Sequence, residues 1–383
     1  MNATQDAAAD GLKALQAGDV QRAFTLLSEA VSGGAGGRNA YMALAIAARE
    51  TKRPGESLAA IERVLKIDPG NLEALIIKAD ALAAQGNERR AAAFYLAAVN
   101  AAQSVGRLSG QLAIEIERAR KECAAAAIRY EEYLRDRVKR LGLFDGSGRA
   151  RGEQALDVLF GRKQIYFQQP EKFFFPELPQ VQFYDPSNFA WTEDVIAATD
   201  DILEELNIAL KERDRFEPYV PANAKTPHLH RHEMMGNENW GALHLIKDGV
   251  RIEENIKFCP ATLAALENAP APNVPGKSPI TLFSRLTPGT HIPPHTGLLN
   301  TRLICHLPVI APEGCTIRVG NQERVWRMGE MLIFDDSIEH EARNNGASDR
   351  VVLLFDIWRP ELSEEERAFV STVFDAIEDY GVF

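Results

Sequence analysis

The sequence predicts a protein of two parts, a helical-repeat module followed by a domain of mainly β structure. Three observations support this prediction: a repeat near the N-terminus, a series of short β-rich runs after Pro279, and a length of 383 residues, which is long for one ordinary domain. We expect helical repeats over residues 5–104, a connecting helix and linker over 105–150, and the β-rich domain with flanking helices over 151–383.

The N-terminal module repeats at an offset of about 34 residues. Gly18 and Gly86 lie two such periods apart with Lys52 at the midpoint, and residues 68–71 (DPGN) break the helical pattern. Small or apolar residues recur where paired helices would approach, at Ala23, Ser57 and Ala91 and again at Ala30, Val64 and Ala98. The segment resembles tetratricopeptide repeats, so three helical hairpins are expected, with a concave surface suited to a peptide or protein partner. A purely structural role, capping or dimerising the C-terminal domain, is the alternative.

The remaining elements follow from periodicity. Helical spacing predicts helices over 108–141, 191–211 and 361–379, and the Gly- and Arg-rich residues 142–152 indicate a domain boundary. Short β-rich runs separated by glycine and asparagine turns predict strands over 280–286, 301–310, 316–319, 323–328, 331–334 and 351–358. Many short strands at even spacing favour a sandwich or barrel, and a double-stranded β-helix of the jelly-roll or cupin kind fits the pattern.

Composition narrows the functional classes. A net charge of −11 and a pI of about 5.4 argue against nucleic-acid binding and against anionic membranes. No apolar run has the length of a membrane span, and the N-terminal residues do not read as a secretory signal. We therefore expect a cytoplasmic protein with four free thiols, at Cys123, Cys259, Cys305 and Cys315.

Histidines are the chemically informative residues of the C-terminal half. His244, His291, His295, His306 and His340 are candidate metal ligands, because imidazole commonly binds iron, nickel, copper and zinc. His295 and His340 could converge in the mouth of a barrel, although spacing alone leaves ordinary polar or core histidines equally open. Alternate histidines also occur in a segment that reads as a loop entering this domain, where a metal site is the less favoured interpretation: His228, His230 and His232.

Several motifs in residues 288–359 occur together and in order: PGTHIPPHTGLLNTRLICHLPV, EGCTIRVGNQERVW, GEMLIFDDSIEHEA and FDIWRPEL. This region resembles the aspartyl/asparaginyl β-hydroxylase family, and fainter likeness extends to WGALHLIKDG and FCPATLAALE. The resemblance implies a double-stranded β-helix that binds Fe(II) and uses 2-oxoglutarate and O₂. It also implies hydroxylation of an amino-acid side chain of the Asp/Asn type in a peptide or protein, with release of succinate and CO₂.

The resemblance also assigns roles to residues. His295 and His340 would be the iron ligands, and Ser284 and Arg350 would hold the distal carboxylate of 2-oxoglutarate. An arginine fork suits a carboxylate, and the apolar VVLLF run after Arg350 indicates that its charge points into the barrel and needs an anion there. His306 would lie beside the oxalyl end of the co-substrate. One face of a predicted strand presents Arg302, Ile304 and His306. We expect Arg302 to bind the co-substrate as well.

Two departures from the family pattern keep other functions open. Gly297 replaces the carboxylate of the usual His-x-Asp/Glu motif, which also allows a halogenase-like or small-molecule hydroxylase centre. Ile304 replaces a second arginine that often faces the site. A non-catalytic scaffold, with repeats that bind a partner and a degenerate oxygenase domain, is the alternative from another class. Asp335 and Asp336 are expected to point to opposite faces before His340, with Asp336 orienting a ligand histidine.

Overall fold

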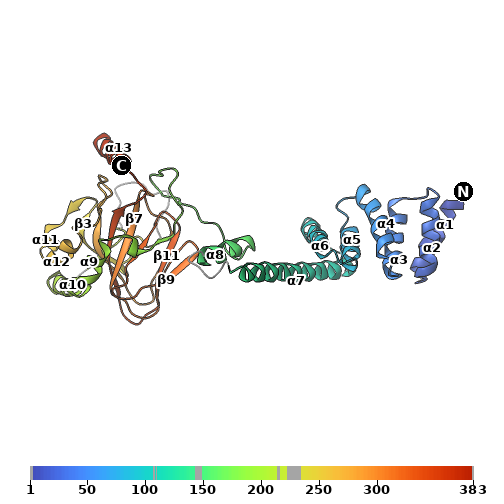
Figure 1. The fold of residues 1–383 in the computed structure, drawn as a ribbon, viewed down its shortest axis with the longest axis horizontal. Helices are drawn as coiled ribbons and strands as arrows, with labels where there is room; N and C mark the ends of the chain where they lie inside the picture. The colour runs from blue at the N-terminus through green and yellow to red at the C-terminus, as the bar shows by residue number, and fades with distance from the viewer. Residues whose placement is uncertain are drawn as a thin grey trace. The chain divides into compact units, whose positions relative to one another are not determined.

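The computed structural model describes residues 3–106, 108, 110–142, 149–213, 216–221 and 234–381. The chain forms two compact units, 1–162 and 163–383, each with its own hydrophobic core (Figure 1). Among the described helices, none combines the length and apolar character needed to span a membrane.

The first unit begins with three helical hairpins, as expected from the repeat. Each hairpin consists of two consecutive helices that pack against each other. The six helices are α1 (Ala3–Gln16), α2 (Val20–Ser32), α3 (Arg38–Glu50), α4 (Pro54–Ile67), α5 (Leu72–Ala84) and α6 (Glu88–Gln103). The break at residues 68–71 is observed, and Asn71 caps α5 by accepting a hydrogen bond from the backbone N–H of Ala74 at 3.0 Å.

The repeat register is confirmed at the hairpin turns and at the helix contacts. Gly18, Lys52 and Gly86 all have positive φ, at 81°, 58° and 75°. This conformation favours glycine, so Lys52 occupies a strained position that the other two hairpins give to glycine. The small and apolar residues of the register are buried at the helix contacts: Ala23, Ser57, Ala91, Ala30, Val64 and Ala98.

Two more helices complete this unit. α7 (Gly110–Arg140) matches the helix expected over 108–141, and Ile116 and Ala119 on it join the core formed by α5 and α6. α8 (Arg149–Leu159) also belongs to the first unit, so the division falls after Arg162 rather than within the glycine-rich residues 142–152.

The second unit contains two antiparallel sheets. The eight-stranded sheet has the order β1-β10-β7-β12-β5-β3-β2, with β4 also paired to β3, and the four-stranded sheet has the order β6-β11-β8-β9. The strands of the larger sheet are β1 (Phe183–Tyr184), β2 (Glu217–Pro218), β3 (Trp240–Lys247), β4 (Val250–Arg251), β5 (Thr281–Leu286), β7 (Arg302–Ile310), β10 (Leu332–Phe334) and β12 (Arg350–Trp358). Those of the smaller sheet are β6 (His291–His295), β8 (Cys315–Val319), β9 (Gln322–Val325) and β11 (His340–Asn344).

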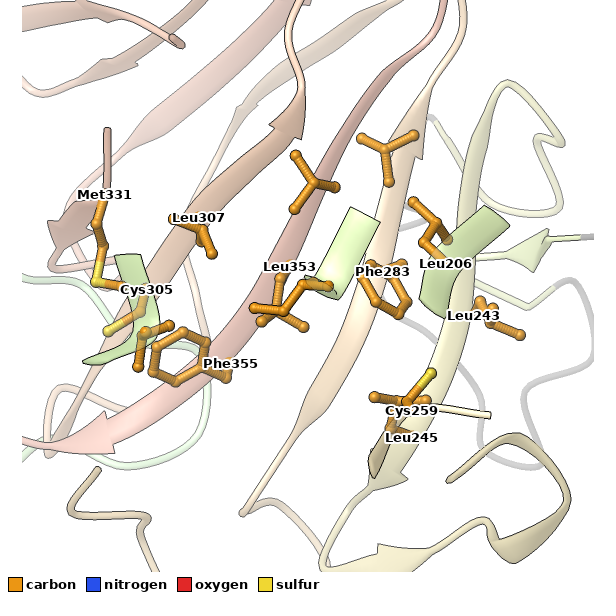
Figure 2. Packing of buried hydrophobic residues seen from close by; sticks show 14 of the residues in the cluster. Leu206, Leu243, Leu245, Cys259, Phe283, Cys305, Leu307, Met331, Leu353 and Phe355 are labelled. Carbon is orange, nitrogen blue, oxygen red and sulfur yellow. The ribbon is translucent and has the colours of Figure 1, made fainter. Parts of the chain in front are cut away.

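One face of the larger sheet is covered by short helices. The helix expected over 191–211 is divided at Ala198 into α9 (Thr192–Ala197) and α10 (Thr199–Arg213), and α11 (Glu253–Ile256) and α12 (Pro260–Ala265) follow β4. Figure 2 shows the apolar cluster on this face, including Leu206 of α10, Phe283 of β5 and Leu353 of β12. The expected C-terminal helix is α13 (Glu364–Tyr380).

The other face of the larger sheet packs on the smaller sheet. Leu282, Ile304 and Val352 of the larger sheet belong to one core cluster with Ile292 and Ile317 of the smaller sheet. The six expected strands correspond to β5, β7, β8, β9, β10 and β12, whereas β3, β6 and β11 were not predicted as strands. β6 contains Pro293 and Pro294, which is compatible with a strand because β6 lies at the edge of its sheet.

Candidate functional site

A cavity of about 720 Å³ lies in the second unit, with walls from both sheets. Every site residue expected from the sequence lines it: Ser284, His295, Arg302, His306, His340 and Arg350. The pairing of β6 with β11 and the order of strands in the larger sheet bring these side chains together from five separate strands.

His295 and His340 form the centre of the cavity. They are paired residues in the β6–β11 register, and their ring centroids lie 4.1 Å apart. The Nδ1 of His295 lies 2.9 Å from the carbonyl oxygen of Pro293, and the Nδ1 of His340 lies 3.1 Å from that of Ile338. If each Nδ1–H donates to its carbonyl, the lone pair of each ring is on Nε2, which is the tautomer that metal-binding histidines commonly adopt.

The environment of His340 favours its neutral form. Burial, and then the neighbouring His295 ring, lower the pKa of His340 well below its usual value. A neutral imidazole retains the lone pair that a metal requires.

Arg350, at the start of β12, is a buried cation without a carboxylate partner among the described residues. Arg350 is 1% exposed, and its Nη1 donates a hydrogen bond to the carbonyl oxygen of Ser284 at 3.3 Å. The Nε atom has no hydrogen-bond partner, and the guanidinium lies 4.4 Å from the centroid of the Trp326 ring. Burial lowers the pKa of Arg350 to about 10. This arrangement suits an anion that enters the cavity.

Ser284 and His306 lie on neighbouring parts of the same wall. The Ser284 hydroxyl accepts a hydrogen bond from Nε1 of Trp240 at 3.3 Å. The Nδ1 of His306 is buried and has no hydrogen-bond partner in the described part of the chain. Burial, followed by the charge of Arg350, lowers the pKa of His306 well below its usual value. A neutral His306 can donate a hydrogen bond to a bound acid without adding charge.

Arg302 shares the cavity face with Ile304 and His306, as the strand alternation predicted, but its charge is already neutralised. Its Nη1 lies 2.9 Å from the carboxylate of Asp356 and donates to the hydroxyl of Ser278 at 2.9 Å. Arg302 is therefore less suited than Arg350 to hold a further carboxylate, although its Nε has no partner in this structure.

Asp336 occupies the space beside Gly297. A Cβ atom added at Gly297 would lie 2.0 Å from Oδ2 of Asp336, so the carboxylate fills the volume that a side chain at position 297 would need. Burial raises the pKa of Asp336 to about 7, whereas the nearby Arg302 opposes this rise. Asp335 points elsewhere and forms a fully buried ion pair with Arg359 at 2.7 Å, in agreement with the expected opposite orientations.

Two of the other candidate histidines, His244 and His291, lie outside the cavity wall. His291 is paired with Glu341 at 2.7 Å, and His244 does not line the cavity wall. His228, His230 and His232 lie outside the described residues. Among the residues that the structure describes, no group of three or more His, Cys, Asp or Glu side chains is arranged to hold a metal ion. The four cysteines are unpaired, as expected.

The sequence did not identify several wall residues. Tyr219 and Trp240 stack with ring centroids 4.2 Å apart and an interplanar angle of 8°, and both line the cavity. Gln169 and Glu171 contribute to the wall from a segment far upstream of the recognised motifs. The faint motif WGALHLIKDG, which begins at Trp240, was the available signal for this strand.

Residues 197–360 match the family described as aspartyl/asparaginyl beta-hydroxylase. The chain is 40% identical to human aspartyl/asparaginyl beta-hydroxylase over 34% of this chain and 17% of that protein. It is 33% identical to human aspartate beta-hydroxylase domain-containing protein 2 over 54% of this chain and 55% of the relative. It is also 34% identical to the ornithine lipid ester-linked acyl 2-hydroxylase of Rhizobium tropici, over 49% of this chain and 63% of that enzyme. The chain thus spans less than two thirds of each of these relatives.

The first unit has similar solved structures. One is the TPR2B-domain:pHsp70 complex of yeast Sti1, with 21% identity over 32% of this chain and 96% of that chain and a TM-score of 0.28.

Proposed function

Because the C-terminal unit of this chain belongs to the aspartyl/asparaginyl β-hydroxylase family, we propose that the protein is an Fe(II)- and 2-oxoglutarate-dependent hydroxylase. The observation that carries the proposal is one cavity containing two facing imidazoles and, on its wall, a buried arginine for which the described residues offer no carboxylate partner. We interpret the two facing sheets as the double-stranded β-helix of such enzymes.

The residues fit an iron ion. Two facing imidazoles, each with Nδ1 beside a backbone carbonyl, suit a divalent transition metal, and His295 and His340 would be its protein ligands. Asp336, buried in the same cavity, would orient water beside these two histidines. Bound iron would supply the activation of O₂ that the side chains of this chain cannot perform.

The residues also fit a dicarboxylic co-substrate. Arg350 would bind the distal carboxylate of 2-oxoglutarate, with the Ser284 hydroxyl as a second donor, because a buried guanidinium is stabilised by an anion that accepts two hydrogen bonds. His306 would donate to the opposite end of the acid. The apolar wall formed by Ile304, Phe334 and Leu354 would exclude bulk water around it.

Hydroxylation is favoured over halogenation by Asp336. A halogenase-like centre needs space for a halide near the ligand position that lacks a carboxylate. Here the Asp336 carboxylate lies against Gly297, and its Oδ2 would be 2.0 Å from a Cβ at that position. A halide in this volume would overlap the van der Waals surface of Asp336. When Asp336 is ionised, its negative charge would also repel the halide.

The substrate we propose is an amino-acid side chain of the Asp/Asn type in a peptide or protein, by analogy with the relatives named aspartyl/asparaginyl beta-hydroxylase. A second candidate is an uncharged aliphatic or acyl carbon, favoured by two observations. Asp356 neutralises Arg302, and position 304 is isoleucine, so the described wall offers an acidic substrate little positive charge beyond Arg350. The acyl 2-hydroxylase relative is consistent with this candidate. We propose that the helical repeats of the first unit bind a protein partner or substrate.

Anaerobic titration of the full chain with Fe(II) and 2-oxoglutarate tests the proposal. The chelate should produce a weak visible charge-transfer band in the wild type, and His295→Ala and Arg350→Ala should lose it. His291→Ala is the matched control, because His291 lies on the same strand outside the cavity wall and should leave the band intact. A wild-type protein that forms no band at saturating iron and co-substrate would favour the non-catalytic scaffold. If the band forms, turnover of 2-oxoglutarate in the presence of peptides or of acyl substrates would separate the two substrate candidates.

A further inference from the structure

A segment outside the family match contacts the loop that follows His295 and the loop that precedes His340. This segment, residues 164–182 and here called the strap, precedes the matched residues 197–360. It crosses the His295 loop (residues 296–301) and the His340 loop (residues 335–339), and two of its residues, Gln169 and Glu171, line the cavity.

The strap binds the His295 loop through its backbone. The N–H of Glu171 donates to the carbonyl oxygen of Gly297 at 2.9 Å, and the N–H of Lys172 donates to that of Leu298 at 3.0 Å. Phe173 and Leu299 form a parallel bridge directly after these bonds. The loop that leaves His295 is thereby held along its length.

The strap binds the His340 loop in the same way. The N–H of Gln169 donates to the carbonyl oxygen of Ser337 at 2.7 Å, and Gln168 forms an antiparallel bridge with Ile338. Ile338 also provides the carbonyl oxygen beside Nδ1 of His340. The strap therefore pairs with the residue whose carbonyl oxygen lies beside this imidazole.

The side chain of Gln168 joins the two loops directly. Its Nε2 donates to the carboxylate of Asp335 at 2.7 Å, and its Oε1 accepts from Nδ2 of Asn300 at 3.0 Å. Gln168 is 5% exposed, and Asp335 and Asn300 are fully buried. Since buried polar groups are costly to leave unpaired, the amide fixes the loops at one separation.

We propose that Gln168 is a positioning residue for the metal centre, and that its amide sets the separation of the imidazoles of His295 and His340. The inference rests on the proposed function, because it takes these two histidines as the metal ligands. Partners beyond the ligands typically alter metal affinity by about 10- to 100-fold when removed. A residue that only stabilised the fold would change the free energy of unfolding and leave the metal spectrum unchanged.

Co(II) binding by the full chain tests this assignment, with Co(II) as an air-stable probe whose visible spectrum reports ligand geometry. Gln168→Ala should weaken Co(II) binding by about 10-fold and change the spectrum. Gln168→Glu keeps an acceptor for Asn300 but places a carboxylate against Asp335, so it should weaken binding as well. Phe167→Ala is the matched control, because this neighbouring side chain is 59% exposed, and it should bind Co(II) as the wild type does.

The ring resonances of His295 and His340 in metal-free protein provide a second readout, assigned with the corresponding alanine variants. Altered resonances in either Gln168 variant support the proposal, and Gln168→Glu decides the outcome if Gln168→Ala does not fold. Wild-type affinity, spectrum and ring resonances in a folded Gln168 variant would overturn it. If the wild type binds no Co(II), the proposed function fails, while the ring resonances still decide whether Gln168 positions the two histidines.

Discussion

Arg350 is a buried charge that lowers the stability of the ligand-free protein. Its guanidinium is buried, and its pKa is lowered to about 10 because the charged form is desolvated. Since the folded state binds this proton less tightly than the unfolded chain, the charge disfavours folding at every pH below about 10, and this cost is relieved as the pH rises further. A bound carboxylate would offset the same cost at neutral pH.

Arg350→Met should therefore have opposite effects on binding and stability. Loss of the charge-assisted hydrogen bonds should weaken 2-oxoglutarate binding by about 10- to 100-fold. The free energy of unfolding of the ligand-free protein should rise by about 1–3 kcal/mol, because the desolvated cation is removed. Calorimetric titration and urea denaturation measure the two effects. Arg285→Met, which alters an arginine outside the cavity wall, should leave 2-oxoglutarate binding unchanged. Unimpaired binding by Arg350→Met would refute the assigned role.

Gly297 and Asp336 should behave as a coupled pair. Gly297→Asp would force a side chain into contact with the Asp336 carboxylate, and overpacking of this kind costs about 1–3 kcal/mol. The double variant Gly297→Asp with Asp336→Gly removes the clash and should recover most of the lost free energy of unfolding. Urea denaturation of the single and double variants measures the coupling. Additive losses in the double variant would show that the two positions are independent.

At the scale of elements, the pairing of β6 with β11 creates the site. This register places His295 opposite His340, although both strands were absent from the prediction. Two consecutive prolines in β6 and the polar sequence of β11 (HEARN) conceal the β pattern. The prolines are compatible with β6 because β6 is an edge strand, where a missing N–H does not break the sheet. β11 lies between β6 and β8, and pairing with both stabilises it despite its polar composition.

The packing of α10 against α12, behind the larger sheet, depends on a buried carboxylate. Both carboxylate oxygens of Glu205, on α10, accept hydrogen bonds from the N-terminus of α12, at the N–H of Ala261 (2.6 Å) and of Thr262 (2.9 Å). Glu205→Ala would leave these donors unpaired and should lower the free energy of unfolding by about 1–3 kcal/mol. Glu204→Ala, at the exposed neighbour, should change it by less than about 0.5 kcal/mol. Equal effects of the two variants in urea denaturation would contradict this account.

At the scale of the whole molecule, the two units have separate hydrophobic cores. The clusters of the helical unit draw only on residues before Arg162, and the clusters around the sheets draw only on residues after it. Each unit can therefore unfold cooperatively by itself. The cavity and all of its described wall residues belong to the second unit.

Ligand binding should accordingly stabilise one unfolding transition. In calorimetry of the full chain, anaerobic Fe(II) with 2-oxoglutarate should raise the melting temperature of the second unit, because a ligand that binds only the folded state shifts its equilibrium. The transition of the helical unit should not move, and His340→Ala should abolish the shift. A single transition that shifts as a whole would instead indicate that the units unfold together.

The sequence by itself determined the features that recur locally. The helical hairpins follow from a short repeat period in which each helix packs on its neighbour, so Gly18, Lys52 and Gly86 revealed the turns. The β-rich runs revealed six strands, and the resemblance of several ordered motifs indicated the family. It also predicted site residues, which the structure places around one cavity.

Only the tertiary structure decided which of these residues meet. It paired Arg302 with Asp356, whereas no carboxylate of the described residues pairs with Arg350. Two arginines in similar strands do not reveal this difference in sequence. It also brought Gln168 to Asp335 across 167 positions. The physical reason is that strand register and loop packing set contacts between distant residues, whereas periodicity and composition report on each segment separately.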